Sequence, residues 1–317
     1  MATQTLAQAS LLINDEIVRG VAEDIITVNP IFNYIPFYGY EGQAIVVNRE
    51  LTLGGVDVNG IGATITSTMK TASTFTQKTF SATRIIGDAE MDKLVRAQSA
   101  SAGVDQLALE ISLKAKNVGR KFQDGMATGT GLTNNLNGFV KLLDATQVTS
   151  SCTATAGRAI SFTLLDELCD LVVAKDGVVD WICMPARTLR SLKALYRALG
   201  GTMPIDVLTM PDGTTRTVYK YEDIPVFVNG YLPIVEDLNA QNQTGGAFNS
   251  VWAGVWDDGT GKVGYAAIHP ASVPAGIMVE HAGVYSDKDV DIWRVKQYVN
   301  FALFNRKGLA RLTSINN

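Results

Sequence analysis

The chain has 317 residues, of which 46% are hydrophobic and 18% are charged, and its formal net charge is −4. This length and composition predict a folded protein with one large or two medium hydrophobic cores. No block of lysine and arginine reaches five residues, which argues against a strongly basic surface that reads DNA sequence.

Membrane and export signals are absent from the sequence. No apolar run approaches the roughly 20 residues that span a bilayer, and the first residues lack the basic start and hydrophobic segment of a signal peptide. We therefore expect a protein that is made and used in the cytosol and has no membrane partner. The three cysteines, Cys152, Cys169 and Cys183, have no paired spacing and are expected to fill apolar space.

The N-terminal part predicts an arm followed by an unusual extended segment. Apolar residues recur at helical spacing over residues 5–26, and the pair Asn29-Pro30 ends that helix. A short strand is predicted at residues 45–47. Residues 53–79 then form a run that is rich in glycine, threonine and serine and carries almost no charge.

This run predicts a β-hairpin that is not stable by itself. Its threonines favour extended backbone, but large apolar residues such as Ile65, Met69 and Phe75 are too few to pack a core. A two-stranded hairpin alone is marginally stable in water, so we expect this one to lie against another chain. A mobile surface loop is the alternative.

A long helix is predicted after the hairpin. Residues 88–95 are predicted as a short helix, and residues 104–126 as a rod of roughly 35 Å at about 1.5 Å per residue. Glu110 and Lys114 have the four-residue spacing of an ion pair. The polar faces, which include Arg120, are expected in water or against a neighbouring subunit. One stripe of this helix is apolar: Val104, Ala108, Ile111, Ala115, Val118 and Phe122.

From residue 161 the pattern becomes α/β. The spacing of apolar residues predicts helices over residues 162–173 and 185–199, with a buried strand at residues 180–184 between them. Gly200-Gly201 ends the second helix. Further strands are predicted at residues 224–228, 250–255, 263–268, 276–279 and 291–304.

The motifs of enzyme chemistry are incomplete. His269 and His281 have no two-histidine spacing, and Gly259-Thr260-Gly261-Lys262 lacks the glycine spacing of a phosphate loop. Asp287, Asp289 and Asp291 begin like a calcium loop, but Ile292 stands where the turn glycine is needed. We therefore predict no catalytic, cofactor-binding or metal-binding residue, and no enzyme activity.

Two functions of other classes remain as alternatives. A hydrolytic enzyme would use residues 161–270 as an α/β catalytic domain with carboxylates as acid and base, but it has no nucleophile or metal constellation. A receptor or carbohydrate-binding module would use Trp252, Trp256 and Trp293, which we expect instead to belong to the core.

The order of these parts resembles a known family. The passage Phe80-Ser81-Ala82-Thr83-Arg84 into the long helix, the turn Gly129-Thr130-Gly131, and Asp180-Trp181-Ile182-Cys183-Met184-Pro185 before the second helix are similar to the major capsid proteins of tailed bacteriophages. These proteins have the Hong Kong-97-type fold, an α+β fold, and the resemblance covers nearly the whole chain. It implies an N-terminal arm at 1–44, an extended loop at 45–87, a peripheral domain at 88–160 containing the spine helix, an axial domain at 161–285, and a return strand at 286–317.

The resemblance also implies function and partners. Identical copies would form hexameric and pentameric capsomers of an icosahedral head, located in the virion and assembled in the cytoplasm of a host bacterium. The head would enclose double-stranded DNA without reading its sequence, together with portal and scaffolding proteins. An encapsulin-like shell around an enzyme is the alternative within the same fold. Contacts between subunits are expected at Ile65, Met69, Lys70, Phe75, Glu110, Lys114 and Arg120.

Overall fold

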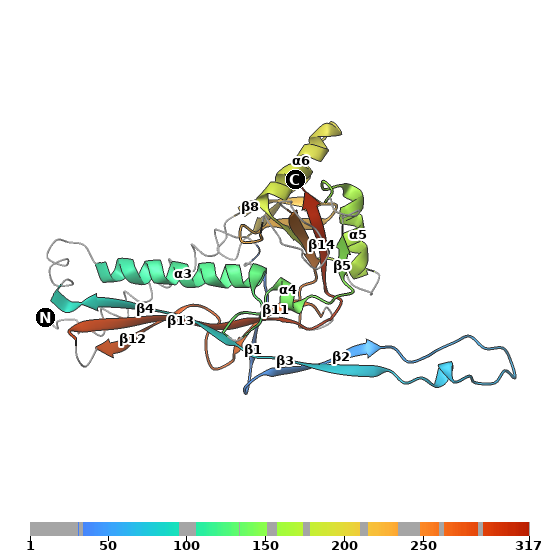
Figure 1. The fold of residues 1–317 in the computed structure, drawn as a ribbon, viewed down its shortest axis with the longest axis horizontal. Helices are drawn as coiled ribbons and strands as arrows, with labels where there is room; N and C mark the ends of the chain where they lie inside the picture. The colour runs from blue at the N-terminus through green and yellow to red at the C-terminus, as the bar shows by residue number, and fades with distance from the viewer. Residues whose placement is uncertain are drawn as a thin grey trace.

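A computed structural model shows an elongated molecule with a hairpin projecting from one side (Figure 1). Residues 1–30, where most of the predicted N-terminal arm lies, fall outside the described part, so the arm remains a prediction. The structure describes residues 31, 34–94, 106–132, 134–150, 157–173, 178–209, 215–233, 248–259, 263–284 and 288–316.

A five-stranded sheet and one long helix form the left part of the view in Figure 1. The central strand is β13, which pairs with β4 along ten consecutive residues and also with β11 and β12. The helix α3 lies along β4 and β13. The elements are β1 (Phe37–Tyr40), β4 (Thr83–Asp92), α3 (Gln106–Thr128), β11 (Tyr265–Pro270), β12 (Met278–Val284) and β13 (Val290–Leu303).

The helix α3 confirms the predicted spine within the described residues. Ile111, Ala115, Val118 and Phe122 are all buried, because residues three and four apart share the face that covers the sheet. The helix ends at Thr128, where Gly129 donates a backbone hydrogen bond to Gly125 at 3.0 Å and the chain turns. This turn contains the Gly129-Thr130-Gly131 segment on which the resemblance partly rests.

The short helix predicted at residues 88–95 is wrong over most of its length. Residues 83–92 form the strand β4, whose register with β13 runs from Thr83 opposite Val299 to Asp92 opposite Val290. Successive side chains of this strand point to opposite faces of the sheet, so Ala89 is buried and the next residue, Glu90, is exposed. Pairing with a distant strand overrides the local preference.

A seven-stranded sheet covered by two helices forms the second part of the described chain. The helices α5 and α6 pack on one face, in a cluster that includes Leu168, Leu192 and Ile182. The predicted helices at 162–173 and 185–199 and the strands at 180–184 and 224–228 are confirmed, whereas the pair β7–β8 was not predicted. The strand order is β5 (Val148–Ser150), β14 (Leu309–Asn316), β10 (Phe248–Gly254), β6 (Trp181–Met184), β9 (Ile224–Val228), β8 (Thr215–Tyr221) and β7 (Ile205–Thr209), with α5 at Phe162–Val173 and α6 at Ala186–Ala198.

The C-terminal segment joins the two sheets. Residues 286–317 were predicted as one return strand, but they contain β13 in the five-stranded sheet and β14 in the seven-stranded sheet. The two strands are separated by a turn at residues 304–308, in which Gly308 donates a backbone hydrogen bond to Asn305 at 3.1 Å. The last part of the chain therefore ties both bodies together.

Aromatic packing between the two sheets makes them one core. Phe139, at the start of the short helix α4 (Phe139–Leu142), has its ring 5.4 Å from Trp181, 5.2 Å from Trp252 and 5.3 Å from Tyr265. Trp252 is buried, as is Trp293 elsewhere, and Trp256 packs against the same core. The tryptophans are core residues, as expected, which removes the observation that would favour a carbohydrate-binding module.

Candidate functional site

The most distinctive surface of the molecule is a two-stranded hairpin that leaves the body. It is made of β2 (Ile45–Thr52) and β3 (Thr74–Phe80), which pair antiparallel from Ile45 opposite Phe80 to Thr52 opposite Thr74. Beyond the paired strands, residues 53–73 form a tip whose regular structure is the short 3-10 turn Thr68–Lys70 (Figure 1). The predicted strand at 45–47 is thus the first part of β2.

The tip exposes large apolar side chains. Val56 and Val58 are 92% and 96% exposed, values that correspond to side chains with almost no neighbours among the described residues. Of the predicted contact residues, Ile65, Lys70 and Phe75 are exposed and Met69 is partly covered. No described residue between 53 and 73 is buried. Exposed apolar residues in such a group mark a surface for another macromolecule.

The base of the hairpin, in contrast, is fixed to the body. Phe80 is buried in a cluster with Tyr40, Ile268 and Ala302. The Arg49 guanidinium donates hydrogen bonds to the backbone oxygens of Phe304, at 3.1 Å, and of Leu303, and it lies 5.4 Å from the centre of the Phe80 ring. Burial lowers the pKa of Arg49, but the group has partners and stays charged. The hairpin therefore projects from a rigid attachment.

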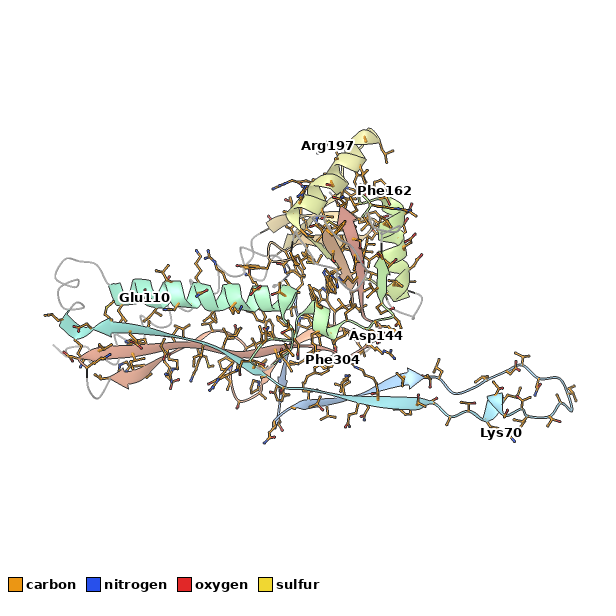
Figure 2. All side chains as sticks on the ribbon, in the orientation of Figure 1. Lys70, Glu110, Asp144, Phe162, Arg197 and Phe304 are labelled. Atoms are coloured by element: carbon orange, nitrogen blue, oxygen red, sulfur yellow. The ribbon has the colours of Figure 1, made fainter. Side chains whose placement is uncertain are left out.

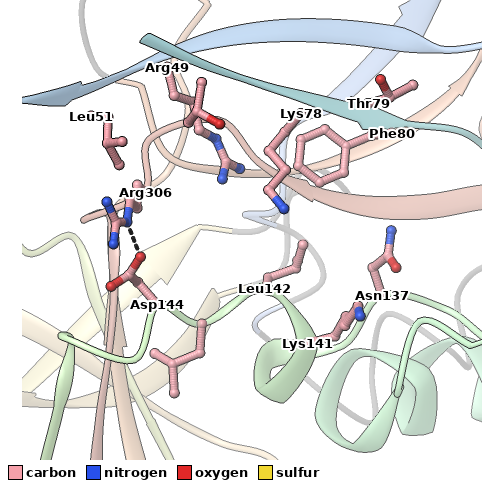
Figure 3. Close-up of a pocket in the computed structure, with 12 residues that line it drawn as sticks. Arg49, Leu51, Lys78, Thr79, Phe80, Asn137, Lys141, Leu142, Asp144 and Arg306 are labelled. Atoms are coloured by element: carbon pink, nitrogen blue, oxygen red, sulfur yellow. Dashed lines mark hydrogen bonds and ion pairs between the residues drawn. The ribbon is translucent and has the colours of Figure 1, made fainter. Parts of the chain in front are cut away.

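A basic cleft of about 420 Å³ lies between the hairpin base and the body (Figure 3). Arg49 and Lys78 line it from the hairpin, and Lys141 and Arg306 line it from the body, with Asp144 as the acidic residue among its lining. Lys78 and Lys141 have no ion-pair partner among the described residues. The cleft therefore keeps a positive charge in the isolated subunit.

Asp144 joins the chain after α4 to the turn between β13 and β14. Its carboxylate accepts a hydrogen bond from Arg306 and two from Thr146, at 2.9 Å from the backbone nitrogen and 2.6 Å from the hydroxyl. Burial by itself would raise the pKa of Asp144, but these hydrogen bonds and the charge of Arg306 hold it well below its usual range. The carboxylate is therefore ionised at neutral pH.

We expect Asp144→Asn to lower the free energy of unfolding by about 1–3 kcal/mol at pH 7, because the Arg306 charge loses its partner. A folded-state pKa below the unfolded value of about 3.9 makes this contribution complete at higher pH and lost as pH falls through the folded pKa. The advantage of the wild type should thus shrink below about pH 4. Urea unfolding at pH 7 and pH 3 measures the difference in the free energy of unfolding between the wild type and the variant. The exposed Asp57→Asn is the control. Equal losses at both pH values would contradict the assignment.

The charged residues predicted on the spine lie far from the hairpin tip. The Glu110 carboxylate and the Lys114 ammonium are 3.7 Å apart, which confirms the predicted ion pair, and Arg120 is exposed on the same helix. Figure 2 shows Glu110 and Lys70 at opposite ends of the molecule. The predicted contact residues therefore form two separate surfaces, and whether they contact other subunits remains a prediction.

The groups that could support chemistry are dispersed or covered. Burial raises the pKa of the Cys169 thiol to about 12 and that of Cys183 further, so both are protonated at neutral pH. His269 Nδ1 lies 2.9 Å from the Val273 backbone oxygen, a structural contact at the end of β11. Within the described ranges, no group of three or more histidine, cysteine or acidic side chains could hold a metal ion. No described helix is long and apolar enough to cross a membrane.

Solved structures share this arrangement over almost the whole chain, although no family model and no curated protein sequence matches it. The holo-SrpI encapsulin complex of Synechococcus elongatus is similar with a TM-score of 0.66 and 11% identity, over 90% of this chain and 87% of that one. The capsid of Myoviridae phage XM1 is similar with a TM-score of 0.55 and 12% identity, over 90% of this chain and 91% of that one. A structure from Mycobacterium phage Ogopogo is similar with a TM-score of 0.58 and 12% identity, over 89% of this chain and 91% of that one.

The chain has the Hong Kong-97-type capsid fold. Within this fold α3 corresponds to the predicted spine helix and the β2–β3 hairpin to the extended loop. The domain boundaries at residues 44, 87, 160 and 285 remain predictions. The α+β class is confirmed.

Several residues of the candidate surface were not predicted from the sequence. The sequence could have indicated the exposed apolar residues Val56, Val58 and Ile61, because they lie in a segment that cannot bury them. It could not have indicated Arg49, Asp144 and Arg306, since their contacts join residues more than 160 positions apart. The sequence does not specify such long-range pairs without a fold.

Proposed function

We propose that this protein is the major capsid protein of a tailed bacteriophage and that identical copies assemble into the hexamers and pentamers of an icosahedral head. The observation that carries the proposal is the hairpin tip, whose apolar side chains pack against almost nothing in the part of the chain that the structure describes. The Hong Kong-97-type fold supports it, because phage capsid structures share this architecture. The function is closure of a shell, and it needs no catalytic group.

The hairpin provides the means of assembly. Its base is held by Phe80 and Arg49, so the tip is presented in a defined direction, and a neighbouring subunit would cover the exposed face. Burying apolar surface contributes about 25 cal/mol per Å², and permanent subunit interfaces commonly exceed about 2,000 Å². Symmetry repeats each modest contact around the capsomer. Ile65, Met69 and Lys70 of the tip and Phe75 of β3 belong to this interface, with Glu110, Lys114 and Arg120 on the spine as further contacts.

The proposed partners follow from the shell. Double-stranded DNA would be enclosed without sequence-specific contacts, in line with the net charge of −4. Portal and scaffolding proteins complete the head, and the protein is located in the virion after assembly in the host cytoplasm. A separate scaffolding protein is part of this hypothesis, and purified subunits that form uniform shells without one would argue against it.

An encapsulin-like compartment is the second candidate function. The observation that favours it is the similarity to the SrpI encapsulin complex, whose TM-score of 0.66 exceeds the values of 0.55 and 0.58 reported above for the phage structures. Both candidates use the same shell geometry. They differ in the cargo, which is DNA for a phage head and a protein for an encapsulin.

The proposal is tested by isolating the particles that contain this protein and determining their contents. Electron microscopy should show closed icosahedral particles, and extraction after nuclease treatment should yield protected double-stranded DNA. Particles of the same shape that contain a single protein and no nucleic acid would replace the phage head with the encapsulin. A protein that stays monomeric and is found in no particle, even where the other head proteins are produced, would contradict both.

A further inference from the structure

The helix α6 presents a basic stripe to solvent. Leu189 and Leu192 face the core, so residues on the other side of the helix face outward. Three arginines on that side are three and seven residues apart, which places them on one stripe. These are Arg187, Arg190 and Arg197, all exposed. Arg187 and Arg190 have no ion-pair partner or hydrogen-bond partner for their side chains among the described residues, and α6 contains no acidic residue.

An apolar strip lies beside this stripe. Ile205 and Val207 of the edge strand β7 are opposite Tyr219 and Thr217 of β8, so their side chains are on the same face of the sheet as Tyr219. Tyr219 is covered by Lys193 of α6, whose ammonium lies 3.5 Å from the ring centre. Ile205 and Val207 are 58% and 59% exposed, because α6 does not reach them. We call Arg187, Arg190, Ile205 and Val207 the basic flank.

The helix α5 carries the opposite charge. Leu164, Leu165 and Leu168 face the core, and Glu167 and Asp170 are exposed three residues apart on the outer side. Neither carboxylate has a partner among the described residues. Val173 continues the same stripe and is exposed, as is Val178 after the helix. We call Glu167, Asp170, Val173 and Val178 the acidic flank.

Both helices carry a charge that their own dipole disfavours. Arg187 lies in the first turn of α6, where the partial positive charge of the helix N-terminus repels a cation. Asp170 lies in the last turn of α5, where the partial negative charge repels an anion. Among the described residues, neither charge has an ion-pair partner. Residues that oppose local preferences without compensation are expected where a partner is bound.

The apolar residues of the basic flank, Ile205 and Val207, lie at the opposite end of the seven-stranded sheet from the acidic flank. The helix α5 packs on β14, β10 and β5 at one end of the strand order, whereas α6 reaches β8 and the basic flank ends at β7. Figure 1 shows α5 on one side of this part of the molecule and β8 on the other. A contact between such surfaces is head-to-tail, and head-to-tail contacts close into rings when the rotation allows it.

We propose that the acidic flank of one subunit binds the basic flank of the next subunit in the capsomer, with a second copy of this chain as the partner. Complementary charges would pair Glu167 and Asp170 with Arg187 and Arg190, while the valines cover Ile205 and Val207. Such pairing fixes the direction and register of the ring and disfavours wrong contacts. This inference rests on the proposed shell function and adds the residues that arrange subunits around each axis.

Charge reversal provides the test. The first variant is Arg187→Glu with Arg190→Glu, the second is Glu167→Lys with Asp170→Lys, and the third combines all four changes. Each of the first two places like charges across the contact and should reduce the yield of capsomers and shells at least about tenfold. The combined variant should restore assembly, because the swapped charges again attract. Reversal removes the charges opposed to the helix dipoles, so the melting temperature of the unassembled subunit should stay unchanged or rise.

The outcomes separate this inference from the proposed function. Normal shells from the first two variants would overturn the pairing and leave the shell function intact. If such shells lacked DNA, the arginines of α6 would instead be assigned to contacts with the enclosed nucleic acid. Failure of the combined variant to recover would also overturn the pairing, since the flanks would not face each other. Wild-type protein that forms no shells when it is co-produced with its scaffolding protein would overturn both. Yields are measured by sedimentation and electron microscopy at matched protein concentration and at two salt concentrations.

Discussion

A subunit without the hairpin tip should fold normally and form no shells. Thr52 and Thr74 are paired, with their hydroxyl oxygens 2.5 Å apart, so an Asn-Gly turn can replace residues 53–73 and close β2 onto β3. The deleted part contains no buried residue, and the new loop is shorter, so the free energy of unfolding should change by less than about 1 kcal/mol. Assembly should be abolished, because the apolar surface of the tip is gone. Circular dichroism and electron microscopy measure the two effects.

A matched variant separates the loss of apolar contact from the change in length. Val56→Ser, Val58→Ser and Ile61→Ser keep every residue of the backbone and remove the exposed apolar side chains, so they should also prevent shell formation. The control replaces polar neighbours, with Thr64→Ser and Thr66→Ser, and should assemble as the wild type does. Normal shells from the turn-closed variant would disprove the role of the tip.

The elements predicted well from the sequence are those whose pattern is local. The helix over residues 162–173 has the predicted bounds because its leucines recur at helical spacing, and the stripe from Ile111 to Phe122 is buried for the same reason. The strand Trp181–Met184 was recognisable as a short apolar run followed by Pro185. In these segments local preference and tertiary packing agree.

The errors occur where pairing between distant segments decides the structure. Residues 88–92 are extended because they pair with β13, which is about 200 positions away, and nothing in the segment itself identifies that partner. The pair β7–β8 was missed because β7 lies at the sheet edge, where Ile205 and Val207 remain exposed and give no pattern of buried residues. Only part of the candidate surface was predicted, again because the rest depends on contacts between distant segments. An uncharged, glycine-rich run reveals that a hairpin lacks its own core, but it does not reveal which charges the fold brings beside its base.

The other large effect is expected from Phe122→Asp, which should prevent the subunit from folding. Phe122 is 4% exposed, and its ring stacks on Phe301 with centroids 4.8 Å apart and on Phe37 at 6.3 Å. Loss of a buried phenylalanine side chain costs about 3–5 kcal/mol, and an unpaired buried carboxylate adds several more. Folded domains have a total stability of about 5–15 kcal/mol, so this variant should be insoluble or degraded.

A substitution on the opposite side of the same helix provides the control for Phe122→Asp. Leu113 is 53% exposed, so Leu113→Asp introduces the same charge into α3 without burying it and should give soluble, folded subunits. Phe122→Leu keeps most of the buried volume and should lower the melting temperature by several degrees while leaving the protein soluble. Soluble Phe122→Asp protein with the melting temperature of the wild type would mean that α3 does not cover the sheet with this face. The orientation of the spine, and with it the charged face assigned to neighbouring subunits, would then be incorrect.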